Sequence, residues 1–202
     1  MISPHLSIET DKVKLRPLEQ NDIASFSPLV KEISLWKYFT FELNEPGELE
    51  KWVGLAINDR EKSIRFPFTI IEKSTKTITG STSYGSISFF DKRIEIGWSW
   101  LGKQFQGTGI NFHAKFCLLN YAFEILQFER VEIKTDNLNE RAKQGLRKIG
   151  AIQEGVLRSH MQMPKERRRD SVYFSIIKNE WPKVRNSIFK DIQTFSYKNE
   201  HL

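Results

Sequence analysis

A short turn with two glycines precedes a helix-like segment in the middle of the chain. It reads Gln104-Phe105-Gln106-Gly107-Thr108-Gly109. Such a turn can present several unpaired backbone N–H groups to a phosphate, because the first amides of a helix lack intrahelical partners and lie at the positive end of its dipole. The same glycines would also suit a tight loop that binds nothing, and the turn alone leaves both interpretations open.

Other chemistries built on short motifs find no support in the sequence. No Gly-Lys-Ser/Thr follows the turn, which excludes a Walker loop, and the three spaced glycines of a dinucleotide fingerprint are missing. Cys117 is the only cysteine and falls in an apolar helical run, so we expect it to be buried and we exclude an internal disulfide or a cysteine-rich zinc site. The four histidines are scattered without ligand-like spacing, and we predict no metal site.

The segments around the turn alternate between strand and helix periodicity. Period-two patterns predict strands at residues 13–18, 66–71, 78–90, 93–98, 130–135, 152–163 and 170–178. Apolar spacings of three and four predict helices at residues 19–38, 46–60, 110–125 and 140–148, with a short docking helix near 184–192. This order predicts an α/β (α+β) domain whose mixed, mostly antiparallel sheet has about six to seven strands and about four flanking helices.

Composition limits the class of protein and its partners. The 202 residues suit one domain, and no run of 18 apolar residues could span a membrane. The first residues lack the basic start and apolar core of a signal peptide, so a cytoplasmic location is the expectation. A net charge of +6 favours an anionic partner. The basic stretch at residues 165–169 is typical of a solvated turn, and without an aromatic-rich signature beside it we do not favour nucleic acid as a partner.

Five ordered pieces of sequence resemble one enzyme family. The first joins Glu95-Ile96-Gly97-Trp98 to the glycine turn and to Tyr121-Ala122-Phe123-Glu124; the others lie at residues 130–132, 139–151, 154–158 and 169–181. Together they resemble the acyl-CoA signature and following elements of the GNAT superfamily of N-acetyltransferases. The most similar branch contains the ribosomal-protein N-terminal alanine acetyltransferases. The resemblance implies a GNAT domain over residues 1–185, and we expect residues 186–202 to form a helical or flexible extension.

The resemblance implies acetyl-CoA as co-substrate and names the residues that would hold it. Backbone amides of the turn and of the following helix would bind the pyrophosphate: Gln104, Gln106, Gly107, Thr108, Gly109, Ile110 and Asn111. Backbone groups at a bulged strand end would pair with the pantetheine arm and donate to the thioester oxygen: Trp98, Ser99, Trp100 and Leu101. The Asn139 side chain would reach the pantetheine, and it is equally suited to cap the helix that follows it.

The implied reaction is direct attack of a neutral amine on the thioester, which needs a base and an acid. Glu95 is the first candidate base and Glu154 the second, although a salt bridge would explain either carboxylate as well. The acid is open. Leu146 stands where many members have a tyrosine, and Ala142 stands where the most similar branch often has a serine. Tyr173, Ser99 or water could replace them.

The acceptor is not specified by the sequence. The resemblance implies a primary amine, on a protein N-terminus or a small molecule, selected by the helices at 19–38 and 46–60 and the hairpin around Arg167. The missing hydroxyls leave a second hypothesis, a non-catalytic acyl-CoA-binding sensor or scaffold. Exposed strand edges would also allow a homodimer.

Overall fold

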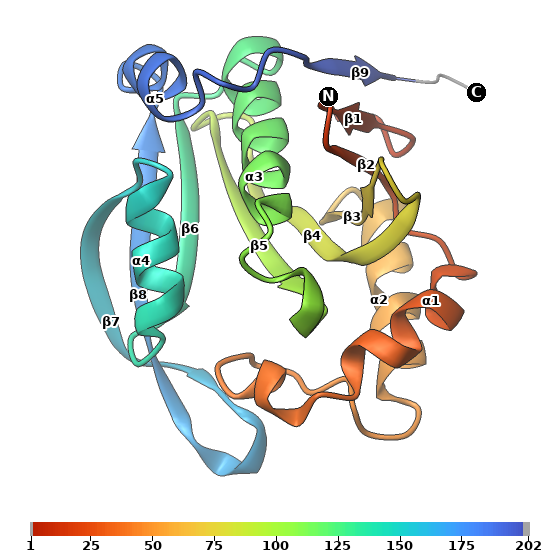
Figure 1. Cartoon of the computed structure of the whole chain (residues 1–202). Helices are drawn as coiled ribbons and strands as arrows, with labels where there is room; N and C mark the ends of the chain where they lie inside the picture. The colour runs from red at the N-terminus through yellow and green to blue at the C-terminus, as the bar shows by residue number, and fades with distance from the viewer. Residues whose placement is uncertain (1, 200–202) are drawn as a thin grey trace.

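A nine-stranded mixed sheet runs through the computed structural model, which describes residues 2–199 (Figure 1). Its order is β7-β8-β6-β5-β4-β3-β2-β1-β9. The strands are β1 (Ser7–Glu9), β2 (Val13–Pro17), β3 (Phe66–Glu72), β4 (Thr77–Ser88), β5 (Arg93–Leu101), β6 (Arg130–Asp136), β7 (Ile152–Gln162), β8 (Arg168–Ile177) and β9 (Ser196–Lys198). The helices are α1 (Asp22–Val30), α2 (Glu48–Glu61), α3 (Ile110–Asn120), α4 (Glu140–Lys148) and α5 (Trp181–Ile188).

The predicted fold class is confirmed, but the sheet has more strands than expected. The two additional strands, β1 and β9, are three residues long and pair with each other at the sheet edge. Three residues are too few to display an alternating pattern, so neither strand could be predicted from periodicity. The predicted strands at 66–71, 78–90, 93–98 and 130–135 correspond to β3, β4, β5 and β6.

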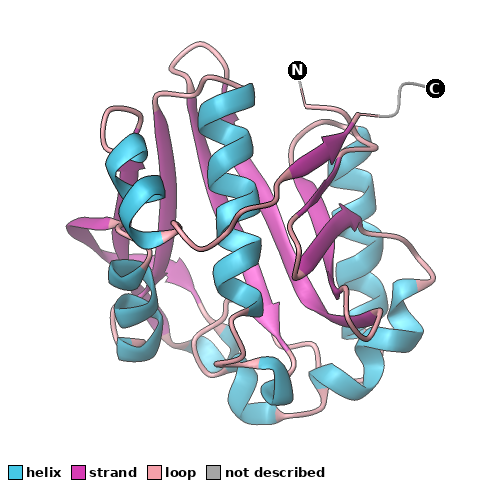
Figure 2. Ribbon diagram, turned by 45° about the horizontal axis from the view of Figure 1, so that its top comes forward, coloured by secondary structure: helices cyan, strands magenta, loops and turns pink. Residues whose placement is uncertain are grey.

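The helices cover both faces of the sheet and bury a separate apolar core on each (Figure 2). One core joins the sheet to α3, α4 and α5, and includes Phe116, Leu146 and Trp181. The other lies under α1 and α2, and includes Phe26 and Trp52. The buried apolar side chains of β3 and β4 enter the first core, and Trp100 of β5 enters the second. The alternate positions of β3 and β4 carry buried polar side chains such as those of Thr69, Ser81 and Ser83.

The expected helix at 19–38 is wrong in its length, because α1 ends at Val30. Glu32 is extended, with φ −71° and ψ 104°, and a short 3-10 turn follows at Ile33–Trp36. The buried Trp36 indole donates to the Val30 carbonyl at 2.8 Å and satisfies one of the free carbonyls at the end of α1. Ile33, which continued the apolar spacing past this break, is exposed, so the spacing did not reflect a continuous buried helix face.

The C-terminal segment packs back onto the domain. The expected boundary at 185 falls inside α5, and β9 joins the sheet beside β1. The division into a domain at 1–185 and an extension at 186–202 stays a prediction, and residues 200–202 lie outside the described residues.

A gap opens in the middle of the sheet. All paired strands are antiparallel except β5 and β6, which are joined through α3 and pair in parallel only from Arg93 to Glu95 with Arg130 to Glu132. Beyond Glu95 the two strands diverge, and α3 lies over the gap between them (Figure 1). One backbone edge of β5 therefore has no strand partner from Ile96 onward.

Candidate active site

The glycine turn leads from the open end of β5 into α3 and carries free backbone donors. Gly107 and Gly109 have φ values of +82° and +88°, which glycine adopts without steric cost. No group among residues 2–199 accepts from the N–H of Gly107, Thr108 or Gly109, and the first bond of α3 runs from His113 to the Gly109 carbonyl at 3.1 Å. Several N–H groups at this helix end are thus available to an anion.

Side chains hold this turn in place between β5 and α4. The Gln106 amide donates to the Leu101 carbonyl at 3.1 Å and accepts from Arg141 of α4. The Thr108 hydroxyl donates to the Phe105 carbonyl at 2.8 Å. Lys12 donates to the Thr108 carbonyl at 2.5 Å, which places an ammonium group beside the turn. This lysine precedes β2 in the sequence, and nothing in its local pattern indicated its position here.

A bulge interrupts β5 next to the gap. The register with β4 shifts between Ser81 and Ser83, and Trp98 has a φ of +51°. The bulge sends Trp98 toward the face covered by α2, whereas Ser99 faces α3. Trp100 returns to the core under α1 and α2, where its ring meets Phe26 at 5.0 Å. The expected bulge is therefore present, in the part of β5 that has no partner on its β6 side.

A buried lysine that the sequence analysis missed lies behind this bulge. Lys115 of α3 is 5% exposed and donates to the Ser99 hydroxyl at 2.7 Å. Ser99 also lies 2.7 Å from the Thr82 hydroxyl. No carboxylate of residues 2–199 forms an ion pair with Lys115, and burial lowers its pKa from 10.5 to about 7. The available signal was a lysine within the apolar stripe of the helix.

Glu95 and Tyr173 lie on the opposite face of the sheet and meet around Lys134 of β6. Glu95 is 4% exposed, with one carboxylate oxygen 2.5 Å from Lys134 and 2.9 Å from the Ser86 hydroxyl. The Lys134 ammonium lies 5.7 Å from the centre of the Tyr173 ring. Glu95 and Tyr173 are thus both near Lys134. Glu95 forms a salt bridge, which the sequence analysis gave as the alternative to a catalytic role.

Glu154 lies apart from this group, on the edge strand β7. Its carboxylate accepts hydrogen bonds from both terminal nitrogens of Arg130 and from the Ser175 hydroxyl, the latter at 2.8 Å. The Arg130 hydrogen bonds hold the pKa of Glu154 below its usual value. Its role as a base stays a prediction that this ion pair does not favour.

Asn139 caps α4 at the gap. Its side-chain oxygen accepts from the Ala142 N–H at 3.0 Å, an N-cap arrangement. Leu146 is buried in the core beneath α3 and α4, so no hydroxyl group occupies the position usual for the acid.

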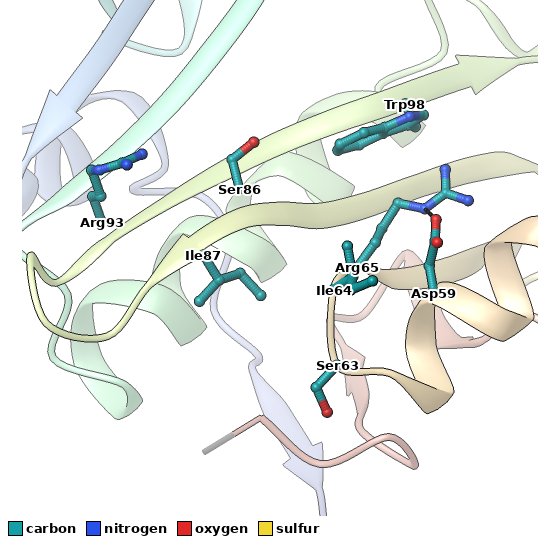
Figure 3. A pocket seen from close by; sticks show the side chains of 8 residues that line it. All are labelled: Asp59, Ser63, Ile64, Arg65, Ser86, Ile87, Arg93 and Trp98. Atoms are coloured by element: carbon teal, nitrogen blue, oxygen red, sulfur yellow. Dashed lines mark ion pairs between the residues drawn. The ribbon is translucent and has the colours of Figure 1, made fainter.

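A pocket of about 570 Å³ lies on the α2 side of the bulge (Figure 3). Trp98 and Arg65 lie next to each other at one end of it, with the guanidinium carbon 5.1 Å from the ring centre. Arg65 pairs with Asp59 of α2 at 3.1 Å. Ser86, which donates to Glu95, also lines the pocket, so a molecule bound there would lie close to the Glu95 carboxylate.

The basic hairpin between β7 and β8 is less free than its sequence indicated. Arg167 pairs with the buried Asp136, Arg168 donates to Ser159, and Lys165 pairs with Glu42 at 3.2 Å. The Lys165 contact connects the hairpin to the segment between α1 and α2. Lys165, Glu166 and Arg168 are exposed, as expected of a solvated turn, whereas Arg167 is half-buried.

Comparison with known proteins identifies this arrangement. The sequence matches the acetyltransferase (GNAT) domain family over residues 12–152, well over half of the chain. The chain belongs to this family. A Bacillus subtilis protein provisionally named a ribosomal N-acetyltransferase, YdaF, is 33% identical over 105 residues, which are 52% of this chain and 56% of that protein. The match thus spans little more than half of that relative.

Solved structures carry the same GNAT fold. A crystal structure described as that of an acetyltransferase, assigned provisionally, from T. thermophilus has a TM-score of 0.83 at 28% identity and covers 91% of this chain and 95% of its own. Mycobacterium smegmatis RimJ, in complex with CoA-disulfide, has a TM-score of 0.77 at 20% identity over 89% and 90% of the two chains. At that identity the likeness is one of fold.

Cys117 is buried as predicted, and burial raises the pKa of its thiol. Residues 2–199 contain no cluster of metal-ligating side chains and no helix long and apolar enough to cross a membrane.

Proposed function

We propose that this chain transfers the acetyl group of acetyl-CoA to a primary amine. The observation that carries the proposal is the coincidence of three features at one place: the gap between β5 and β6, the unpaired edge of β5, and the free N–H groups that begin α3. A ligand that combines a pyrophosphate with an extended amide-containing arm is complementary to this combination. Acetyl-CoA is such a ligand, and it supplies the acetyl thioester.

Different residues along the gap bind different parts of acetyl-CoA. Backbone amides of Gly107 to Asn111 hold the pyrophosphate, with Lys12 adding a positive charge. The N–H of Gln106, which the sequence analysis also assigned to this site, donates instead to the Lys103 carbonyl at 3.2 Å. The free edge of β5 from Trp98 to Leu101 pairs with the pantetheine arm and donates to the thioester oxygen. Asn139 reaches the arm with its amide while its oxygen caps α4.

Glu95 acts as the base and Lys115, through Ser99, as the acid, from opposite faces of the sheet. Glu95 removes a proton from the amine through a water molecule on the pocket side. As the new C–N bond forms and the C–S bond breaks, the Ser99 hydroxyl gives its proton to the leaving thiolate and recovers one from Lys115. After the transfer Glu95 is protonated and Lys115 is neutral, and exchange of protons with solvent restores both groups. This pair replaces the hydroxyl groups lost at Leu146 and Ala142.

The acceptor is a primary amine that enters from the face covered by α1 and α2. The pocket beside Trp98 and Arg65 and the hairpin around Arg167 border this entrance. The name of YdaF refers to a ribosomal substrate for that protein, which supports protein N-termini among the acceptors to be tested. The alternative of a non-catalytic acyl-CoA sensor has no specific observation in its favour.

Placing a negative charge at Gly107 tests the pyrophosphate site. Nothing lies within 4 Å of a Cβ built there, and Asn and Asp both tolerate positive φ, so Gly107→Asp and Gly107→Asn should fold alike. We expect Gly107→Asp to raise the Kd of CoA at least ~10-fold more than Gly107→Asn does, because only aspartate repels the pyrophosphate. Calorimetric titration with CoA measures this. Equal affinities in the two variants would place the cofactor elsewhere.

Asn139→Asp separates the cap from the cofactor contact. Aspartate keeps the oxygen that accepts from Ala142 but lacks the amide N–H donors. We expect an unchanged melting temperature and a rise of ~10-fold in the Kd of CoA, the value of one lost hydrogen bond. Asn139→Ala, which should lose ~1 kcal/mol of stability as well, is the matched comparison. Wild-type affinity in Asn139→Asp would leave Asn139 as a cap alone.

A further inference from the structure

A buried arginine near the start of β8 has no hydrogen-bond partner for its Nε–H group within the described part of the chain. Arg169 of β8 is 7% exposed, and its Nε–H donates to no group among residues 2–199. A buried guanidinium normally finds carboxylates or carbonyls, because an unsatisfied buried charge is costly. Its position on β8 places it on the same face as Tyr173, away from the core that contains Val172 and Phe174.

The carboxylates nearest to Arg169 already have other partners. Asp136 and Glu95 are the two acidic groups whose charge acts on it. Asp136 is held by Arg167 and accepts from the Leu138 N–H at 2.9 Å, whereas Glu95 is held by Lys134. With each carboxylate neutralised by a different cation, Arg169 is the surplus positive charge of this buried group.

Two further polar groups on the same pair of strands lack partners. The Nδ1 atom of His160 and the hydroxyl oxygen of Ser171 are buried and bond to nothing among residues 2–199. His160 packs its ring against Tyr173 at 5.8 Å and lies within electrostatic range of Arg169, Lys134 and Glu95. Two unsatisfied polar groups and one surplus cation on the same pair of strands form a site for an anionic group with several acceptor atoms.

We propose that Arg169 binds a carboxylate carried by the acceptor, so that the substrate class is a primary amine bearing a carboxylate close to the amino group. This inference rests on the proposed function. The planar guanidinium matches a carboxylate with two parallel hydrogen bonds. Glu95, which acts on the amine, is linked to this end of β8 by a row of contacts on one face of the sheet. Lys134 lies 2.5 Å from Glu95 and 5.7 Å from the Tyr173 ring, and that ring lies 5.8 Å from the His160 ring. The acceptor therefore carries its amine and its carboxylate on one small molecule or one residue. A free amino acid and an acidic N-terminal residue of a peptide share this chemistry.

Paired substrates test the proposal in the full chain. L-Glutamate and L-leucine are compared with their amides, and a peptide beginning with Asp with one beginning with Asn, by CoA release and by mass spectrometry. We expect Arg169→Met to raise the KM for carboxylate-bearing amines ~10- to 100-fold, the value of a charged hydrogen bond, and to leave the KM for the amides and for acetyl-CoA unchanged. Arg158→Met, an exposed arginine of the same hairpin, is the control.

Arg169→Lys controls for misfolding of the Arg169→Met variant, because lysine keeps the positive charge and loses only the planar, two-pronged geometry of the guanidinium. It should show a smaller effect with the same selectivity. Equal losses on acids and amides, or a wild-type preference for the amides, would overturn the proposal. A preference for free amino acids over peptides would identify a small molecule as the source of the carboxylate. A preference for peptides would identify the N-terminal residue of a peptide as its source.

Binding measurements separate this proposal from the proposed function. Calorimetric titration of L-glutamate and its amide into the CoA-saturated protein requires no turnover. Arg169-dependent binding of glutamate with no acetylation of any amine would support the carboxylate site and contradict the acetyltransferase. Acetylation with no dependence on Arg169 in either assay would support the acetyltransferase and contradict the carboxylate site.

Discussion

Replacing Lys115 by methionine is expected to stabilise the fold and to impair the reaction. The lysine is buried with only a hydroxyl as partner, so methionine, of similar length, removes a desolvated charge. If Ser99 and Lys115 protonate the leaving thiolate, kcat should fall ~100-fold, the lower range for general acid catalysis. A residue that costs stability and serves activity is typical of functional sites.

The stability difference should depend on pH in a defined window. Burial lowers the pKa of Lys115 from 10.5 in the unfolded chain to about 7 in the folded one. Below pH 7 both states are protonated and the full penalty, ~5 kcal/mol from this shift, destabilises the wild type. Between pH 7 and 10.5 the unfolded state binds more protons, so wild-type stability rises with pH toward that of the variant.

Urea unfolding of both proteins at about pH 6, 8 and 10 measures this difference. Lys183→Met, at an exposed position of α5, is the control and should show no such pH dependence. A difference that stays constant with pH would mean that Lys115 is not desolvated. Wild-type kcat in Lys115→Met would remove it from the proposed mechanism.

Glu95→Gln is expected to lower kcat/KM by ~100- to 10,000-fold, because the amide cannot accept the proton from the amine. The affinity for CoA should not change, since Glu95 lies on the opposite face from the pyrophosphate turn. Glu132→Gln provides a matched control: it is a carboxylate on the neighbouring strand, paired with Arg130 at 2.8 Å and not with Lys134. Steady-state rates of CoA release with a saturating amine give the comparison.

A second variant distinguishes the base from a structural ion pair. Glu95→Gln leaves Lys134 without a carboxylate, which destabilises a partly buried cation. Adding Lys134→Met should restore stability. Activity should stay low in the double variant if Glu95 accepts the proton, and recovery of activity would show that Glu95 serves only to neutralise Lys134.

The sequence predicted the local elements well where periodicity and turn chemistry agree. The limits of α4, and the order of strands from β2 through β8, follow from apolar spacing and from stop signals such as Gly150. The helix expected at 19–38 is too long, because apolar spacing does not report where a buried tryptophan ends a helix. Strands of three residues carry no period, and β1 and β9 were missed for that reason.

The candidate site was only partly accessible from the sequence, for a physical reason. The glycine turn is local, and its backbone geometry depends on residues adjacent in the chain. The roles of Lys115, Arg169 and Lys134 depend on neighbours 16 to 74 residues away in the sequence. Packing of α3 against β5 and the pairing of β5, β6 and β8 bring these neighbours together. A charge within an apolar stripe was the only available signal.

The most direct test of the account uses isotope-labelled acetyl-CoA, the purified protein and a panel of amino acids, amides and peptides, analysed by mass spectrometry. We expect acetyl label on the amino group of carboxylate-bearing primary amines, equimolar release of CoA, and loss of both in Glu95→Gln. Tight binding of CoA with no label on any amine in the panel or in a cell lysate would contradict it.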